Sequence, residues 1–182
     1  MTTKSDFTPE EWNALLRGPL ATNLYIVVAD PSVFGSIKEV MAFSKDIIET
    51  LTQPDTAELL RFMLADLQDK NTLKGVMPEI KGDPATVKAE LKKLIQASVS
   101  LLNDKATPEE SQHIRQWMYD LAVRTAEAAR KGGFLSIGSV RVSEQEKQAL
   151  AELTQLLGVD HGAESGTAKE TSASPSEKEG EE

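Results

Sequence analysis

The sequence predicts an all-α protein, a helical bundle of about six or seven helices, and three observations support this prediction. Aromatic residues make up only 5% of the chain, and Leu, Ala, Val and Ile fill most apolar positions, a mixture that favours packed helices over β-sandwiches or barrels. In several segments the apolar residues recur at the three- and four-residue spacing of a helix. Four segments begin with Ser/Thr-x-x-Glu, the pattern of a helix capping box.

The N-terminal region begins with a strong helix signal. Thr8 and Glu11 are spaced as in a capping box, in which each side chain accepts a hydrogen bond from the backbone amide of the other residue. The helix that follows meets Gly18 and Pro19, and proline has no amide hydrogen to donate to the helical ladder. We therefore expect a kink or break there, and a second helical piece that ends near Asp30 and Pro31.

Two more helices are predicted before the middle of the chain. Ser36 and Glu39 form another capping box, which opens a helix that extends to about Leu51. A proline separates this helix from the next, which Asp55 and Glu58 open and whose apolar residues recur at helical spacing.

A long connection is predicted at residues 70–84, where two glycines and two prolines interrupt the pattern. It is the best candidate for a boundary inside the folded region. Asp83, which a proline follows, then opens a long helix to about residue 103.

The last two predicted helices repeat the capping signals of the first two. Thr107 and Glu110 repeat the first box letter for letter, and their helix ends where two consecutive glycines begin at Gly132. Ser143 and Glu146 open the final helix, which also ends at a glycine.

These signals predict one all-helical domain at residues 1–159. Within it, 8–51 and 107–157 could be two pseudo-repeated helix–loop–helix units joined by helices in 55–103, because each unit carries a Thr box, a loop and a Ser box in the same order. Chance recurrence of good capping boxes in a helical protein is the alternative. Residues 160–182 hold too few apolar side chains to offset the entropy of ordering, so we expect a disordered acidic tail.

The charge and hydropathy of the chain narrow the choice of partners. The net charge is −9, of which the seven acids and two bases of the tail supply −5, which leaves −4 for residues 1–159. Phosphate binding needs concentrated positive charge, so nucleic acid is not an expected partner. The longest apolar run, LYIVVA, is too short for a membrane span, and no secretory signal is evident. The expected location is therefore the cytoplasm.

Residues with catalytic or metal-binding chemistry are few. The chain has no cysteine, which excludes disulfides and thiolate metal sites. Its two histidines are His113, early in a predicted helix, and His161, in the tail. We find no nucleophile–base pair, phosphate-binding glycine loop or other cofactor pattern. The sequence therefore predicts neither an enzyme nor an organic cofactor, and His113 is interpreted as a partly exposed helical histidine.

The loop between the last two predicted helices carries apolar residues that could form a docking surface. They are Phe134, Leu135, Ile137 and Val140. If these side chains are exposed, they form a patch for a partner protein or a second copy of the chain. The favoured alternative is that they pack back onto the flanking helices.

Two segments resemble the TerB-type helical proteins of tellurite resistance, in which an alanine-rich helix ends in an Asp-Gly turn before a Ser-x-x-Glu helix start. The residues that carry the resemblance are Ala128, Ala129, Gly132, Ser143, Glu146 and Leu150, echoed by Ala29, Asp30, Ser36 and Glu39. The resemblance implies divalent-metal binding by acidic residues, for which the candidates are Asp30, Glu39, Glu144 and Glu146. Lys131 and Pro31 depart from the turn of the family. Residues 132–153 are also similar to a signature of an uncharacterised bacterial family, which implies no function.

The sequence thus favours a non-catalytic helical interaction or scaffold protein, with stress response as a biological setting and a protein partner or a homo-oligomer as its assembly. The alternative is a TerB-like protein that binds a divalent metal. An enzyme of unidentified class is the third interpretation.

Overall fold

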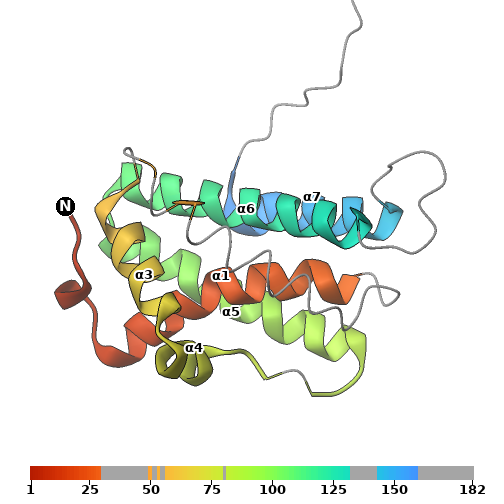
Figure 1. The fold of residues 1–182 in the computed structure, drawn as a ribbon, viewed down its shortest axis with the longest axis horizontal. Coiled ribbons are helices and arrows are strands. Elements are labelled where there is room, and N and C mark those ends of the chain that lie inside the picture. Colours follow the sequence, from red (N-terminus) through yellow and green to blue (C-terminus); the bar gives the residue numbers. More distant parts are fainter. Residues whose placement is uncertain (30–48, 51–52, 54–55, 80, 132–142, 160–182) are drawn as a thin grey trace, which may run out of the picture.

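The computed structural model describes residues 1–29, 49–50, 53, 56–79, 81–131 and 143–159, and of residues 128–131 the backbone alone. The elements there are the 3-10 helix η1 (Lys4–Asp6) and the helices α1 (Pro9–Ala29), α3 (Glu58–Gln68), α4 (Lys70–Val76), α5 (Pro84–Lys105), α6 (Pro108–Lys131) and α7 (Glu144–Leu157). The predicted all-α class is confirmed, with six α-helices in this part of the chain (Figure 1). None of these helices is both long and apolar enough to cross a membrane.

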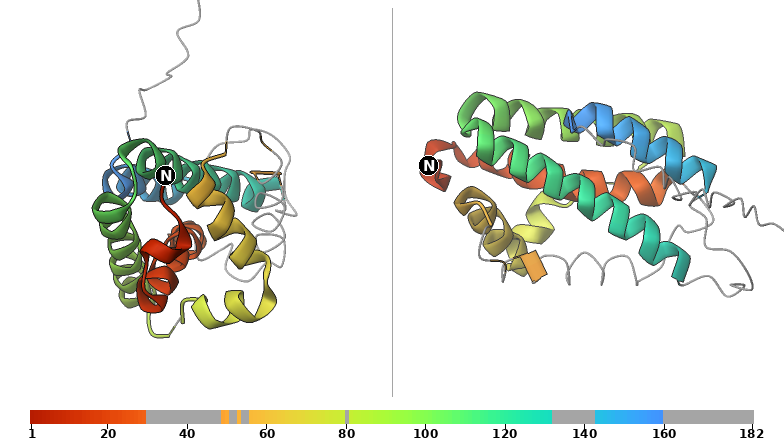
Figure 2. Two further views of the ribbon diagram at one scale, coloured as in Figure 1. Left: turned by 90° about the vertical axis from the view of Figure 1, so that its left-hand side faces the viewer. Right: turned by 90° about the horizontal axis from the view of Figure 1, so that it is seen from above.

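Helix α1 lies at the centre of the bundle and contacts α4, α5, α6 and α7. Its most extensive contact is with α5, and the two helices run antiparallel. Lys105 at the end of α5 pairs with Glu11 at the start of α1. Further along, Lys92 lies over the ring of Tyr25. Helices α6 and α7 cover the other side of α1 (Figures 1 and 2).

Helix α6 runs in the same direction as α1. Near the ends of the two helices, Thr125 Oγ1 donates to Asn23 Oδ1 at 2.6 Å. Near the start of α6, Glu110 Oε1 accepts a hydrogen bond at 3.1 Å from the amide of Thr2, in the segment that precedes α1. Helix α7 runs back along α6, because Arg115 in the first half of α6 donates to the carbonyl oxygen at the end of α7, at 3.0 Å. The four long helices therefore alternate in direction, as in an up-down bundle.

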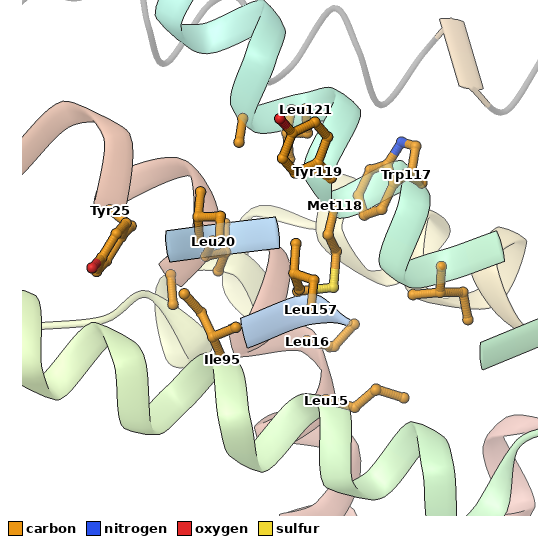
Figure 3. Packing of buried hydrophobic residues seen from close by; sticks show 14 of the residues in the cluster. Leu15, Leu16, Leu20, Tyr25, Ile95, Trp117, Met118, Tyr119, Leu121 and Leu157 are labelled. Carbon is orange, nitrogen blue, oxygen red and sulfur yellow. The ribbon is translucent and has the colours of Figure 1, made fainter. Parts of the chain in front are cut away.

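One hydrophobic core joins the helices (Figure 3). Its largest fully buried side chains are Leu15, Leu16, Tyr25, Ile26, Leu59, Leu60, Met63, Leu64, Leu67, Leu91, Ile95 and Leu102. Helices α6 and α7 close the cluster with Met118 and Leu157, both 0% exposed. Helix α3 packs against α4 and α6, so the short middle helices are part of the same core.

The predicted capping boxes at Thr8, Thr107 and Ser143 are confirmed. The Thr8 amide donates to Glu11 Oε2 at 2.8 Å, and the Glu11 amide donates to Thr8 Oγ1 at 3.2 Å. The boxes at Thr107 and Ser143 have the same pair of bonds. Helix α7 ends as predicted at Gly158, whose φ of 60° lies in the left-handed region that glycine adopts at low cost.

Of the kink or break predicted at Gly18 and Pro19, the break is wrong, because α1 continues through both residues as one helix of 21 residues. Pro19 cannot donate to the carbonyl oxygen of Leu15, and the Oγ of Ser98 on α5 donates to it instead, at 3.1 Å. Gly18 allows this close approach, since a Cβ at that position would lie 2.5 Å from the Cβ of Ser98. A buried hydroxyl on the neighbouring helix thus satisfies the interrupted ladder.

The middle of the chain differs from the prediction in two places. Helix α3 has Ala57 at its N-cap, without a side-chain hydrogen bond, and the predicted cap residue Asp55 lies outside the described residues. The predicted connection at 70–84 contains helix α4 in its first half. Asp69 opens this helix by accepting hydrogen bonds from two backbone amides of its first turn.

Several predicted features lie outside the described residues. They are most of the helix expected after Ser36, the loop at 132–142 and the tail at 160–182. Of the helix after Ser36, Glu49 and Thr50 are described, and both are helical. The pseudo-repeat therefore stays a prediction.

Candidate functional site

An open hollow lies along the outer face of α6. Its volume is about 400 Å³, which is within the size range of ligand-binding pockets. The residues that line it are Thr50, Gln53, Glu109, Gln112, His113, Gln116, Trp117, Asp120 and Arg124. We call this hollow the α6 groove.

The α6 groove follows from the residue spacing in α6. Seven of its nine residues belong to this helix and recur at steps of three and four between Glu109 and Arg124, which places them on one helical face. Ile114, Met118 and Leu121 on the other face are fully buried. Helix α6 therefore turns an apolar face to the core and a polar face to the groove.

Trp117 is the aromatic residue of the α6 groove. Its side chain is only 5% exposed, and its indole Nε1 donates to Thr50 Oγ1 at 3.0 Å. This bond satisfies the polar edge of the ring and fixes its orientation between the core and the groove. The groove thus has a rigid aromatic surface.

The rim of the α6 groove is polar and partly unsatisfied. The side chains of Gln53, Glu109, Gln112 and His113 are exposed and have no hydrogen-bond or ion-pair partner among the described residues. Amide and imidazole groups can both donate and accept hydrogen bonds. These four side chains can therefore bond to an incoming polar group without first breaking a bond within the described part of the protein.

Because His113 shares the α6 groove with Glu109 and Asp120, acid–base chemistry has to be considered. In the described part of the chain, neither carboxylate is hydrogen-bonded to the imidazole, and Asp120 instead accepts from Gln116 at 2.9 Å. The hydroxyl of Thr50 accepts from the indole of Trp117. A catalytic histidine is usually oriented by an acceptor and paired with a nucleophile. Among the described residues, the imidazole of His113 has neither an orienting acceptor nor a hydrogen-bonded nucleophile.

A second polar cluster joins α7 to α1 and α5. Glu152 on α7 accepts a hydrogen bond from Tyr25 Oη, and its oxygens lie 3.1 Å from Lys88 Nζ and 2.8 Å from Lys92 Nζ. The two Nζ atoms also lie 5.0 Å and 5.8 Å from the centroid of the Tyr25 ring, within the range of cation–π attraction. We call these four residues the Glu152 cluster.

The electrostatics of the Glu152 cluster indicate a structural role. Burial works to raise the pKa of Glu152, but hydrogen bonds from the two lysines and Tyr25 outweigh it and lower this pKa to about 2. Burial, and then the bond to Glu152, raises the pKa of Tyr25. At neutral pH the carboxyl is thus ionised and the phenol is neutral. Each group is already paired, so the cluster holds α7 against α1 and α5.

Of the four residues predicted as metal ligands, two are described, and both have other partners. Glu146 is 2% exposed and accepts the N-cap amide of α7 at 2.8 Å. Glu144 is exposed and pairs with Lys147 Nζ at 2.6 Å. Asp30 and Glu39 lie outside the described residues. In the described ranges, no three His, Asp or Glu side chains are grouped closely enough to hold a metal ion.

The sequence did not predict the α6 groove. Its polar residues follow the pattern of the solvated side of an amphipathic helix, and spacing alone does not distinguish such a side from a binding surface. A signal that could have found it is the composition of this face, where Gln112, His113 and Gln116 adjoin Trp117. The docking residues that were predicted, Phe134, Leu135, Ile137 and Val140, lie outside the described residues.

The fold and the site define an all-helical protein with an open polar groove along α6. Comparison of the chain with models of known protein families, with curated proteins and with solved structures finds no match in any of the three. The function is therefore inferred from the residues of this chain.

Proposed function

We propose that this protein is a non-catalytic helical interaction module that binds a segment of a partner protein in the α6 groove. The observation that carries the proposal is the composition of the groove, in which a rigidly held Trp117 lies among polar side chains. Four of these, on Gln53, Glu109, Gln112 and His113, have no partner in the described part of the chain. An aromatic anchor with polar groups around it is typical of the residues that contribute most to protein–protein binding.

The charges of the α6 groove favour a peptide over a nucleic acid. Glu109 and Asp120 outnumber Arg124, the one cationic side chain among the described lining residues, so the groove does not attract phosphate. The amide groups of Gln53 and Gln112 can each donate and accept a hydrogen bond. They match the alternating carbonyl and amide groups of an extended peptide.

A capture experiment with matched variants tests the proposal. The tagged full chain, a groove variant with Gln112→Ala and His113→Ala, and a control variant with Gln96→Ala and Gln155→Ala are each used to capture proteins from the host. The control residues are exposed glutamines on α5 and α7, outside the groove. We expect the wild-type and control chains to capture a common protein that the groove variant does not retain. Circular dichroism checks that all three chains are folded.

The outcomes test two statements separately: that the partner binds in the α6 groove, and that the protein is an interaction module. Equal capture by all three chains would contradict binding in the α6 groove. A wild-type chain that captures nothing and remains a monomer in sedimentation would contradict the interaction module itself. Self-association that the groove variant loses would identify the partner as a second copy of the chain.

A further inference from the structure

A second hollow lies between α1, α4 and α5. Its volume is about 580 Å³. Its lining consists of Arg17 from α1, Lys74 and Gly75 from α4, Leu94 from α5 and the segment 77–79 that follows α4. None of these residues belongs to the α6 groove. We call this hollow the α4 pocket.

The cations of the α4 pocket differ from most others in the described part of the chain. The lysines on the surface of the long helices pair with carboxylates, as Lys93 does with Glu90. Among the arginines and lysines whose side chains the structure describes, those without an ion pair or a side-chain hydrogen bond are Arg17, Lys70 and Lys74. Two of these three line the α4 pocket, which concentrates unpaired positive charge in a protein whose net charge is −9.

The carboxylate within the α4 pocket has a partner outside the pocket lining. Glu79 pairs with Lys81 Nζ at 2.6 Å. Arg17 is half-buried on α1. A planar guanidinium presents parallel N–H groups that fit a carboxylate or a phosphate, and the ammonium of Lys74 adds a further donor.

The rest of the α4 pocket is apolar and has open space. Met77 is 43% exposed, although methionine is usually buried, and Leu94 is only partly buried. A Cβ added at Gly75 would meet no atom within 4 Å, so there is room beside α4. Flexible thioether side chains of this kind adapt to varied apolar ligands.

From this combination we propose that the α4 pocket binds a small amphiphile. Its anionic head, a carboxylate or a phosphate, bonds to Arg17 and Lys74, and its short apolar body covers Met77 and Leu94. The proposal does not depend on the α6 groove, because the two hollows share no residue.

Calorimetric titration of the full chain with decanoate, kept below its critical micelle concentration, tests the proposal. We expect one site per chain and a roughly tenfold loss of affinity in Arg17→Gln and in Lys74→Gln, because each removes one charge-assisted bond. Gly75→Leu fills the open space and should also weaken binding. Because the helix propensity of leucine is close to that of alanine, α4 should stay folded in this variant. Lys70→Gln, on the same helix but outside the lining, should bind as the wild type does.

Several results would overturn the proposal. They are the absence of binding heat, unchanged affinity in Arg17→Gln, equal binding of neutral decyl maltoside, and binding of inorganic phosphate as tight as that of decanoate. Vesicles that contain an anionic lipid form a separate arm. If they bind the wild type but not Arg17→Gln, and decanoate does not bind, the same cations face a membrane surface and the small-molecule site is wrong.

Discussion

At the residue scale, Ser98 explains how a proline is accommodated inside α1. Proline in a helix leaves the carbonyl oxygen four residues earlier without its donor, and a buried oxygen in that state costs stability. Ser98 supplies the donor from α5, and Gly18 provides the space for it. The three positions Gly18, Pro19 and Ser98 therefore work as a unit across two helices.

We predict that Ser98→Ala lowers the free energy of unfolding by about 1–3 kcal/mol, because the Leu15 carbonyl oxygen is left without a partner. Urea denaturation followed by circular dichroism measures the change. Ser100→Ala, on the same helix but exposed, is the control and should change stability by less than about 0.5 kcal/mol. Equal effects of the two substitutions would contradict the role given to Ser98.

The pKa of Glu152 leads to a prediction about pH. Its folded-state pKa of about 2 is below its ordinary value of 4.5, so its contribution to stability is present above pH 4.5 and is lost as the pH falls toward 2. Glu152→Gln should therefore lower the free energy of unfolding at pH 7 by about 1–3 kcal/mol, a range that allows for partial solvent screening of the cluster.

The difference in stability between wild type and Glu152→Gln should shrink between pH 4.5 and pH 2. Denaturation curves of both proteins across this range measure it. Glu144→Gln is the matched control, since Glu144 is exposed and pairs only with Lys147 among the described residues. A difference that is the same at pH 7 and pH 2.5 would show that the charge of Glu152 does not hold α7.

At the element scale, capping boxes define where α1, α6 and α7 begin. Each box satisfies amide groups that the helical ladder leaves open. The box of α7 has a second role, because Glu146 is buried while it accepts the Ser143 amide. In α6 the corresponding Glu110 also accepts the amide of Thr2, so a cap there ties the N-terminal segment to the bundle.

We predict that Ser143→Ala destabilises the protein by about 1 kcal/mol, because the Glu146 amide loses its acceptor. Ser143→Thr keeps a hydroxyl at the N-cap and should retain most of the stability. Hydrogen exchange measures where the stability is lost, and we expect faster exchange of the amides in the first turn of α7. Faster exchange spread evenly over α1 and α5 as well would contradict a local cap.

At the scale of the whole molecule, one core cluster contains residues of α1, α3, α5, α6 and α7. Helix α1 contacts all the long helices, so its loss would remove a shared surface from each of them. The N-terminal segment is tied down too, since Lys4 Nζ and Trp12 Nε1 both donate to Asp66 Oδ2 of α3. This arrangement indicates a single cooperative unit.

We predict that the bundle unfolds in one transition and that Leu16→Ala lowers its free energy of unfolding by about 2–5 kcal/mol, because the side chain is fully buried. Circular dichroism and tryptophan fluorescence should give the same midpoint, before and after the substitution. Leu150→Ala, at a partly buried position of α7, should cost less. Separate midpoints for the two probes would contradict a single unit.

The metal hypothesis is also tested on the whole chain. Because Glu144 and Glu146 are engaged by Lys147 and by the N-cap of α7, we expect calcium, magnesium and zinc to give no heat beyond dilution in calorimetric titration. Binding that Glu146→Gln abolishes would contradict this expectation and support the TerB-like alternative.

The sequence by itself determined the helical class and most helix limits, because these depend on local chemistry. The capping boxes at Thr8, Thr107 and Ser143, the N-cap Asp83 and the terminal Gly158 act within one turn of the chain, and the structure contains each of them. The box predicted at Ser36 lies outside the described residues. The signal of Asp69 before α4 was also local, but the glycines and prolines around it favoured a connection.

The tertiary structure decided the features that depend on partners distant in the sequence. Pro19 stays inside α1 because Ser98 on α5, 83 residues after Leu15 in the sequence, donates a hydrogen bond to the carbonyl oxygen of Leu15. The Glu152 cluster draws its groups from α1, α5 and α7. The α6 groove and the α4 pocket exist only where separate segments meet. The local sequence pattern shows that a helix has a polar face, but it does not show whether that face borders a hollow.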